Sequence, residues 1–127
     1  LMLLKRVSIT EKAMHVVDQL REKHGDLIFH QSGGCCDGSM PMCFKEGGFL
    51  IGRRDICLGK IHGCNFYMAS DQFEYYKNMH ISIDVVEGRG SSFSLEIPLG
   101  VRFMAVSTLF SDDELIELNA SEHLISS

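Results

Sequence analysis

The stretch from residue 8 to residue 30 constrains the fold more than any other part of the chain. Ser8-Ile-Thr-Glu11 has the spacing of a capping box, and apolar residues then recur at helical intervals as far as Gly25. These features predict an amphipathic helix over residues 9–23 that ends at the glycine. The apolar run Leu27-Ile-Phe-His30 follows directly and is typical of a short buried strand. The chain therefore begins with a helix that leads into a buried strand.

The remainder of the chain predicts short strands separated by glycines, and a second helix over residues 70–78 whose Phe73 and Tyr76 face the core. Alternating apolar residues around Gly88-Arg-Gly90 predict a hairpin. The expected strands cover residues 49–51, 55–61, 64–69, 80–86, 93–97 and 101–108. The fold class is therefore a single small α+β domain over residues 1–110, with a mixed or antiparallel sheet, an N-terminal helix and a short second helix. Residues 111–127 are expected to be a C-terminal extension that is a short helix or partly disordered.

Composition narrows the function classes. The 127 residues carry a formal charge of −5, which argues against a nucleic-acid partner, and the pairs Lys5-Arg6 and Arg53-Arg54 are expected on the solvated surface. No apolar run approaches the ~18 residues of a membrane span, so we expect a cytoplasmic protein with no membrane contact. In that compartment the five cysteines are expected to be free thiols, metal ligands or catalytic groups.

Residues 30–44 form the cysteine-rich loop, which gathers three of the five cysteines next to a histidine and several glycines. Thiolate and imidazole are the ligands that zinc and iron prefer, so the segment predicts a metal site. The candidate ligands are Cys35, Cys36 and Cys43, with His30 as the fourth. Iron, zinc or an iron–sulfur cluster would fit such donors, although the spacing matches neither a zinc ribbon nor a ferredoxin.

Two other interpretations of this loop remain open. In the first, Cys35 or Cys36 is a nucleophile or redox-sensing thiol and His30 is its base, with glycine-flanked amides as an oxyanion cradle. In the second, the cysteines only fill space in the core. No third residue that would orient the histidine can be identified from the sequence.

Other polar groups also have two interpretations each. Cys57 is expected to be a packed thiol, whereas the pair His62 and Cys64 would extend a metal site if strand pairing brought them beside Cys43. His80 and Asp84 fall on the polar face of one strand, with Glu96 expected opposite. They form either a solvated sheet face or an oxygen-rich second site.

Two stretches carry a family resemblance. His30-Gln-Ser-Gly-Gly-Cys-Cys-Asp-Gly-Ser-Met-Pro-Met-Cys-Phe44 and Asp84-Val-Val-Glu-Gly-Arg-Gly-Ser-Ser-Phe-Ser-Leu-Glu96, with Arg102-Phe103 after them, resemble a small bacterial family of unknown function. That family is often encoded beside aldehyde dehydrogenases. The resemblance implies an accessory role in aldehyde or alcohol oxidation and an aldehyde dehydrogenase as a candidate partner.

The order of elements is also similar to that of the A-type iron–sulfur carriers, the HesB-like domains. In those carriers a cysteine that binds iron or a cluster follows a Gly-Gly pair, and Gly34-Cys35 would occupy that place here. The carriers end in a Cys-Gly-Cys pair that this chain lacks after Cys64. A ligand set must then come from the loop itself or from a second copy in a homodimer. Three functions follow as expectations: a metal-binding accessory protein, a thiol enzyme or sensor, and a non-catalytic module that docks on a dehydrogenase.

Overall fold

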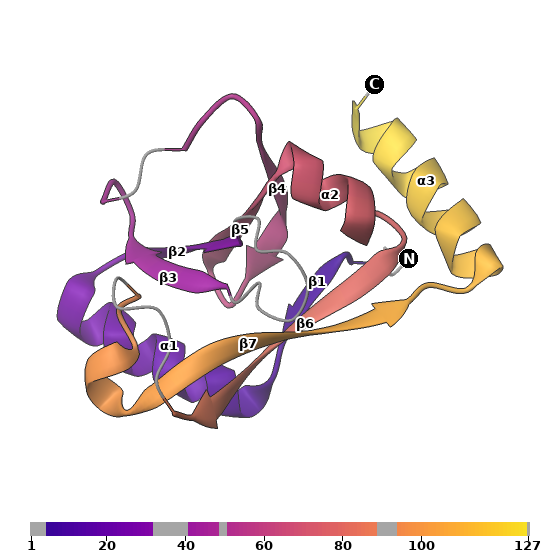
Figure 1. The fold of residues 1–127 in the computed structure, drawn as a ribbon. Helices are drawn as coiled ribbons and strands as arrows, with labels where there is room; N and C mark the ends of the chain where they lie inside the picture. Colours follow the sequence, from indigo (N-terminus) through magenta and orange to yellow (C-terminus); the bar gives the residue numbers. More distant parts are fainter. Residues whose placement is uncertain (1–4, 32–40, 49–50, 89–93, 127) are drawn as a thin grey trace.

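The computed structural model describes residues 5–31, 41–48, 51–88 and 94–126, and all structural statements below concern these residues. Two mixed β-sheets pack into one small α+β domain, as the sequence predicted (Figure 1). The elements in chain order are β1 Val7–Ile9, α1 Glu11–His24, β2 Leu27–Gln31, β3 Met42–Lys45, β4 Asp55–Ile61, β5 Cys64–Ala69, α2 Ser70–Tyr76, β6 Met79–Glu87, the 3-10 helix η2 Ile97–Leu99, β7 Val101–Leu109 and α3 Asp112–Ser126.

The first sheet has the order β1-β6-β7 and the second has the order β3-β2-β5-β4. In the first sheet β1 runs parallel to β6, and β7 runs antiparallel to β6. In the second, β2 is parallel to β5, while both outer strands are antiparallel to their neighbours. The two sheets approach each other where β1 lies against β4. A Cβ atom on Gly59 of β4 would lie 3.2 Å from Cγ2 of Val7, and Gly59 has φ +153°, so both the close approach and the backbone conformation favour glycine at this crossing.

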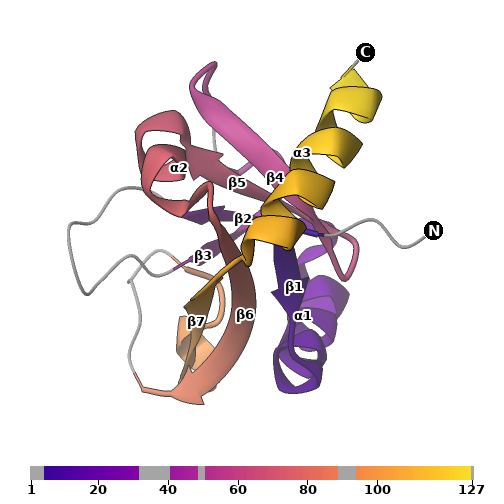
Figure 2. The same ribbon diagram turned by 90° about the vertical axis from the view of Figure 1, so that its right-hand side faces the viewer.

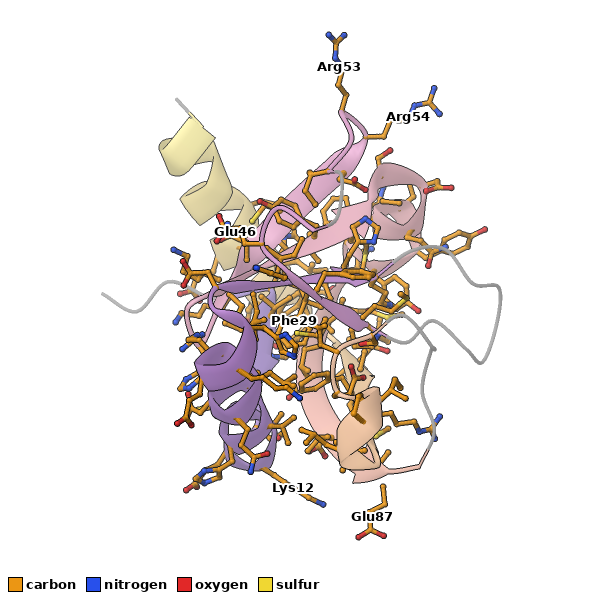
Figure 3. The ribbon with its side chains drawn as sticks, turned by 90° about the vertical axis from the view of Figure 1, so that its left-hand side faces the viewer. Lys12, Phe29, Glu46, Arg53, Arg54 and Glu87 are labelled. Carbon is orange, nitrogen blue, oxygen red and sulfur yellow. The ribbon has the colours of Figure 1, made fainter. Side chains whose placement is uncertain are left out.

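The core lies between the two sheets and is closed on one side by α1 (Figure 1). Phe29, at the centre of β2, is fully buried and meets the ring of Phe103 edge to face with centroids 4.9 Å apart. Figure 3 shows Phe29 in the middle of the molecule, with Arg53 and Arg54 extending from the turn before β4 into solvent. The expected surface position of Arg6 is wrong: it is 9% exposed, donates to the carbonyl of Lys77 and lies over the ring of Phe73.

Helix α1 begins two residues later than predicted, because the chain before it is used as strand β1. Thr10, not Ser8, is the cap: its side chain accepts from the Ala13 N–H at 3.2 Å. Gly25 ends the helix with φ +82°, as the sequence indicated. Phe73 and Tyr76 of α2 pack against the core, also as predicted. No helix among the described residues is long and apolar enough to cross a bilayer.

The predicted hairpin around Gly88-Arg-Gly90 is wrong. Strand β6 pairs along its whole length with β7, and the residues from Ser94 to Gly100 form turns and η2. Pro98 lies within η2, where no backbone N–H is needed for strand pairing, and proline has no backbone N–H to donate. The expected strand at 49–51 begins with two residues outside the described part of the chain, and Ile51 is not in a strand.

Candidate functional site

A histidine and an aspartate meet on the outer face of the four-stranded sheet. His30 comes from β2 and Asp55 from the start of β4, and β5 runs between these strands. The Nε2 atom of His30 lies 2.8 Å from Oδ1 of Asp55, and the two side chains are only 6% and 13% exposed. Gln31, the last residue of β2, comes just before the glycine and cysteine segment. The pair therefore lies where β2 leads into the cysteine-rich loop.

Asp55 is held as an ionised acceptor. Burial alone would raise its pKa, but hydrogen bonds from His30 and from the Gly52 N–H, together with attraction to His30, lower the pKa below its ordinary value. The second carboxylate oxygen accepts from the Gly52 N–H at 2.8 Å. Because an ionised carboxylate only accepts, Nε2 of His30 must carry the proton in this contact. In a neutral His30 ring, Nδ1 is then the basic nitrogen.

Two further side chains share this face of the sheet. The register places Tyr67 of β5 opposite both His30 and Cys57. Cys57 is exposed, so the expectation of a packed thiol is wrong. A β-bulge after Cys57 shifts the register of β4. Asp55 and Cys57 therefore lie on the outer face, whereas Gly59 lies against Val7 of β1.

Cys43 does not join His30. It lies opposite Phe29 in the β2–β3 ladder, whereas His30 lies opposite Met42, so the thiol and the imidazole point to opposite faces. Cys43 is fully buried, and that burial, helped by the carboxylate of Glu96, raises the pKa of its thiol. A buried thiol with a raised pKa packs as a small apolar side chain and is a weak nucleophile at neutral pH.

The other predicted ligands, Cys35 and Cys36, fall outside the described residues. Of the four predicted site residues, His30 and Cys43 lie on opposite faces of the sheet. The roles of Cys35 and Cys36 remain predictions. Among the described residues, no group of three or more His, Cys, Asp or Glu side chains is placed to hold a metal ion.

Cys64 and His62 face α1. Cys64 is buried on the core face of the sheet, and burial raises the pKa of its thiol despite a hydrogen bond from Arg21 Nη2 at 3.2 Å. His62 takes φ +46° in the turn between β4 and β5, and its Nε2 lies 2.7 Å from Oδ1 of Asp18. Asp18 and Arg21 of α1 thus bind His62 and Cys64, respectively, at this turn. These contacts explain His62 as a structural group.

Glu96 forms a buried polar cluster of its own, not the predicted partner of His80. It is 1% exposed, accepts from the hydroxyl of Ser94, and accepts from the Phe103 N–H at 3.1 Å. Ser94 in turn accepts from the Cys43 N–H at 2.9 Å. The cluster ties the segment after residue 93 to both sheets.

His80 and Asp84 lie on the outer face of the three-stranded sheet, as predicted. There, His80 Nε2 lies 2.8 Å from the Ser8 hydroxyl, and Asp84 accepts from Thr10 at 2.9 Å. These bonds pair β6 with β1 and the start of α1. They give both residues a structural role on this face.

A family model described as a domain of unknown function, DUF779, matches residues 16–109. The chain belongs to the DUF779 family. No curated protein and no solved structure matches the chain.

The DUF779 match contains every residue of the site. His30, Asp55, Cys57 and Tyr67 lie within it, as does the whole four-stranded sheet. Strand β1 and helix α3 lie outside the matched span. The matched span therefore contains the sheet that carries the His30–Asp55 pair, most of α1, the helices α2 and η2, and the β6–β7 ladder.

Sequence reasoning missed Asp55, the residue that orients His30. The two are 25 positions apart, and only the order β2-β5-β4 brings them together. No local signal in the sequence marks the pair, because a carboxylate 25 positions away is one of many that could meet the imidazole.

Proposed function

We propose that this DUF779 protein is a thiol-dependent enzyme or sensor in which Cys35 or Cys36 reacts and the His30–Asp55 pair activates it. The observation that carries the proposal is the 2.8 Å contact between two side chains that are almost wholly buried. A histidine oriented by a carboxylate is the arrangement that nucleophilic catalysis uses to take a proton from a thiol or hydroxyl. In this proposal Asp55 is the residue that orients the histidine, which could not be identified from the sequence.

Position along the chain supports the same assignment. Covalent geometry limits the Cα of Cys35 to within roughly 14 Å of the end of β2, which is the strand that carries His30. Cys43, by contrast, faces the core and has a raised thiol pKa, so it is not a competing nucleophile. Among the three loop cysteines, Cys35 and Cys36 are therefore the candidates for the reactive thiol.

We propose an aldehyde as the electrophile that this thiol attacks. The resemblance to a family encoded beside aldehyde dehydrogenases supports this choice. In the proposed step, His30 takes the thiol proton, the sulfur attacks the carbonyl carbon, and the proton returns to the carbonyl oxygen to give a hemithioacetal. The step is reversible, consumes no oxidant, and would let the protein capture or sense aldehydes on behalf of a partner dehydrogenase.

The test is a pH series of alkylation rates for each cysteine in the native protein, read by peptide mass spectrometry. We expect one loop cysteine to react fast at neutral pH, and His30→Gln or Asp55→Asn to move its pH–rate profile to higher pH. Cys57, which is also exposed, is the internal control, and His15→Gln on the exposed face of α1 is the matched histidine control. Uniformly slow alkylation with the same profile in all variants would sink the proposal.

A metal-binding accessory function is the second candidate, and the same pair favours it. A carboxylate that receives the N–H of a histidine commonly orients that ring toward a metal. The ligands would be His30, Cys35 and Cys36, with iron, zinc or an iron–sulfur cluster as the metal, and the layout shared with A-type carriers supports this choice. Elemental and absorption analysis of anaerobically purified protein separates the two candidates: Cys35→Ala should abolish metal content, and Cys43→Ala should leave it unchanged.

A further inference from the structure

The His30–Asp55 contact spans three strands of one sheet. His30 lies on β2 and Asp55 on β4, and β5 runs between these strands (Figure 2). Neighbouring strands are spaced about 4.8 Å apart, so the backbones of β2 and β4 lie roughly 10 Å from each other. The 2.8 Å contact between Nε2 and Oδ1 is therefore made by two side chains that reach toward each other over β5. The side chains that β5 carries at this crossing determine whether the two can meet.

The strand register identifies the residues at the crossing. His30 lies opposite Tyr67 of β5, and Asp55 lies opposite Ala69. Because Tyr67 and Ala69 are two positions apart, they share the outer face with the pair. A line from His30 to Asp55 thus crosses β5 between these two side chains. The hydroxyl of Tyr67 accepts from Asn65 Nδ2 at 3.4 Å, which holds that side chain on the side away from Ala69.

Local sequence rules do not favour alanine at position 69. Ala69 ends β5 and is the N-cap of α2, with φ −62° and ψ 143°. Alanine is disfavoured in strands, and serine, threonine, aspartate or asparagine is preferred at an N-cap, where the side chain accepts from the first turn. Ala69 makes no such bond, and Asp71 instead accepts from the Gln72 N–H at 3.1 Å. Threonine would satisfy both the strand and the cap preference better than alanine does.

A residue that breaks two local rules is expected where another requirement dominates, and here that requirement is space over β5. A branched or longer side chain at position 69 would extend from the outer face into the line between the imidazole and the carboxylate. Asp55 is held in place on this line. Its second carboxylate oxygen accepts from the Gly52 N–H at 2.8 Å, and the carbonyl of the preceding residue, Arg54, accepts from the Ser70 N–H at 2.8 Å.

We propose that Ala69 is a positioning residue, whose small side chain lets His30 reach Asp55 across β5 and so orients the imidazole for activation of the thiol. The role in activation rests on the function proposed above, whereas the role in the contact does not. Ala69 acts only through the pair and touches no reacting atom. Serine at this position should preserve the contact, because its oxygen can turn toward the first turn of α2, whereas leucine should break it.

Proton NMR of the His30 Nε2–H, assigned by its loss in His30→Gln, tests the contact without any thiol chemistry. A bond to an almost wholly buried carboxylate protects this proton from solvent, so the wild type should show the signal at neutral pH. Ala69→Leu should lose it and Ala69→Ser should keep it. Cys57→Leu also adds bulk to the outer face, but away from the line between the pair, and should keep the signal. In Ala69→Leu the pKa of Asp55 should rise, because the bond from His30 that lowers it is lost.

A signal that persists in folded Ala69→Leu would overturn the proposal, as would its equal loss in Cys57→Leu. If Ala69→Leu does not fold, thermal unfolding in a His30→Ala background decides, since the imidazole no longer crosses β5 there. Adding Ala69→Leu to that background should then change Tm little, and a protein that still does not fold would show that position 69 rejects bulk for a reason unrelated to His30.

The alkylation series separates this inference from the proposed function. We expect Ala69→Leu to move the pH–rate profile of the reactive loop cysteine to higher pH, as His30→Gln does, while Ala69→Ser keeps the wild-type profile. If Ala69→Leu loses the Nε2–H signal and the profile stays unchanged, the positioning of the pair stands and the activation of the thiol is refuted.

Discussion

Replacing Glu96 with leucine should be among the most destabilising single changes in the molecule. The carboxylate is 1% exposed and accepts from two donors, the Ser94 hydroxyl and the Phe103 N–H. Leucine fills similar space but leaves both donors without an acceptor. Each unsatisfied buried donor costs about 1–3 kcal/mol, so we expect a loss of about 2–6 kcal/mol. This loss is a large share of the total free energy of unfolding, which is typically about 5–15 kcal/mol.

Urea denaturation measured by circular dichroism checks this magnitude. The midpoint should fall while the slope stays close to wild type, since the native surface is unchanged. Glu87→Leu makes the same chemical change at the exposed end of β6 and should cost no more than about 0.5 kcal/mol (Figure 3). Glu96→Gln keeps one acceptor and should fall between the two. A Glu96→Leu variant as stable as Glu87→Leu would refute the reasoning.

Three further predictions follow from described contacts. Because the pKa of Asp55 is lowered, its ionised form stabilises the fold at pH values above the ordinary pKa of 3.8, and this contribution is lost as the pH falls through the lowered pKa. The difference in free energy of unfolding between wild type and Asp55→Asn should therefore shrink to zero in acid. A difference that does not change with pH would contradict this prediction. Gly63→Ala should destabilise more than Gly47→Ala in thermal unfolding: both have φ above +80°, but only at 63 would a Cβ lie 3.0 Å from Arg21 Nη2. Cys57 should be alkylated far faster than Cys43 or Cys64 in the native protein, because Cys57 is the exposed one of these three described thiols, and equal rates by mass spectrometry would show that the core opens.

Local sequence signals were enough for the fold class but not for the pairing of strands. The helix that ends at Gly25 and the strands at 55–61 and 64–69 depend on periodicity and turn residues, which are local properties. The false hairpin had the same alternation as a true strand, since Leu95 and Ile97 alternate with Ser94 and Glu96. What distinguishes the segment is that these polar residues are buried and bonded to β3 and β7, and no local pattern records that.

The candidate site divides along the two faces of one sheet. The sequence places His30 and Cys43 in a single loop, and nearness along the chain suggested that they act together. Strand β3 folds back on β2 so that Cys43 lies opposite Phe29, and a shift of one position in that ladder would have put the thiol beside the imidazole. Because strand register determines which side chains share a face, His30 gains a distant carboxylate, Asp55, and loses a nearby cysteine. The proposed chemistry therefore depends on the imidazole oriented by Asp55, and a metal site with both His30 and Cys43 as ligands would require this ladder to break.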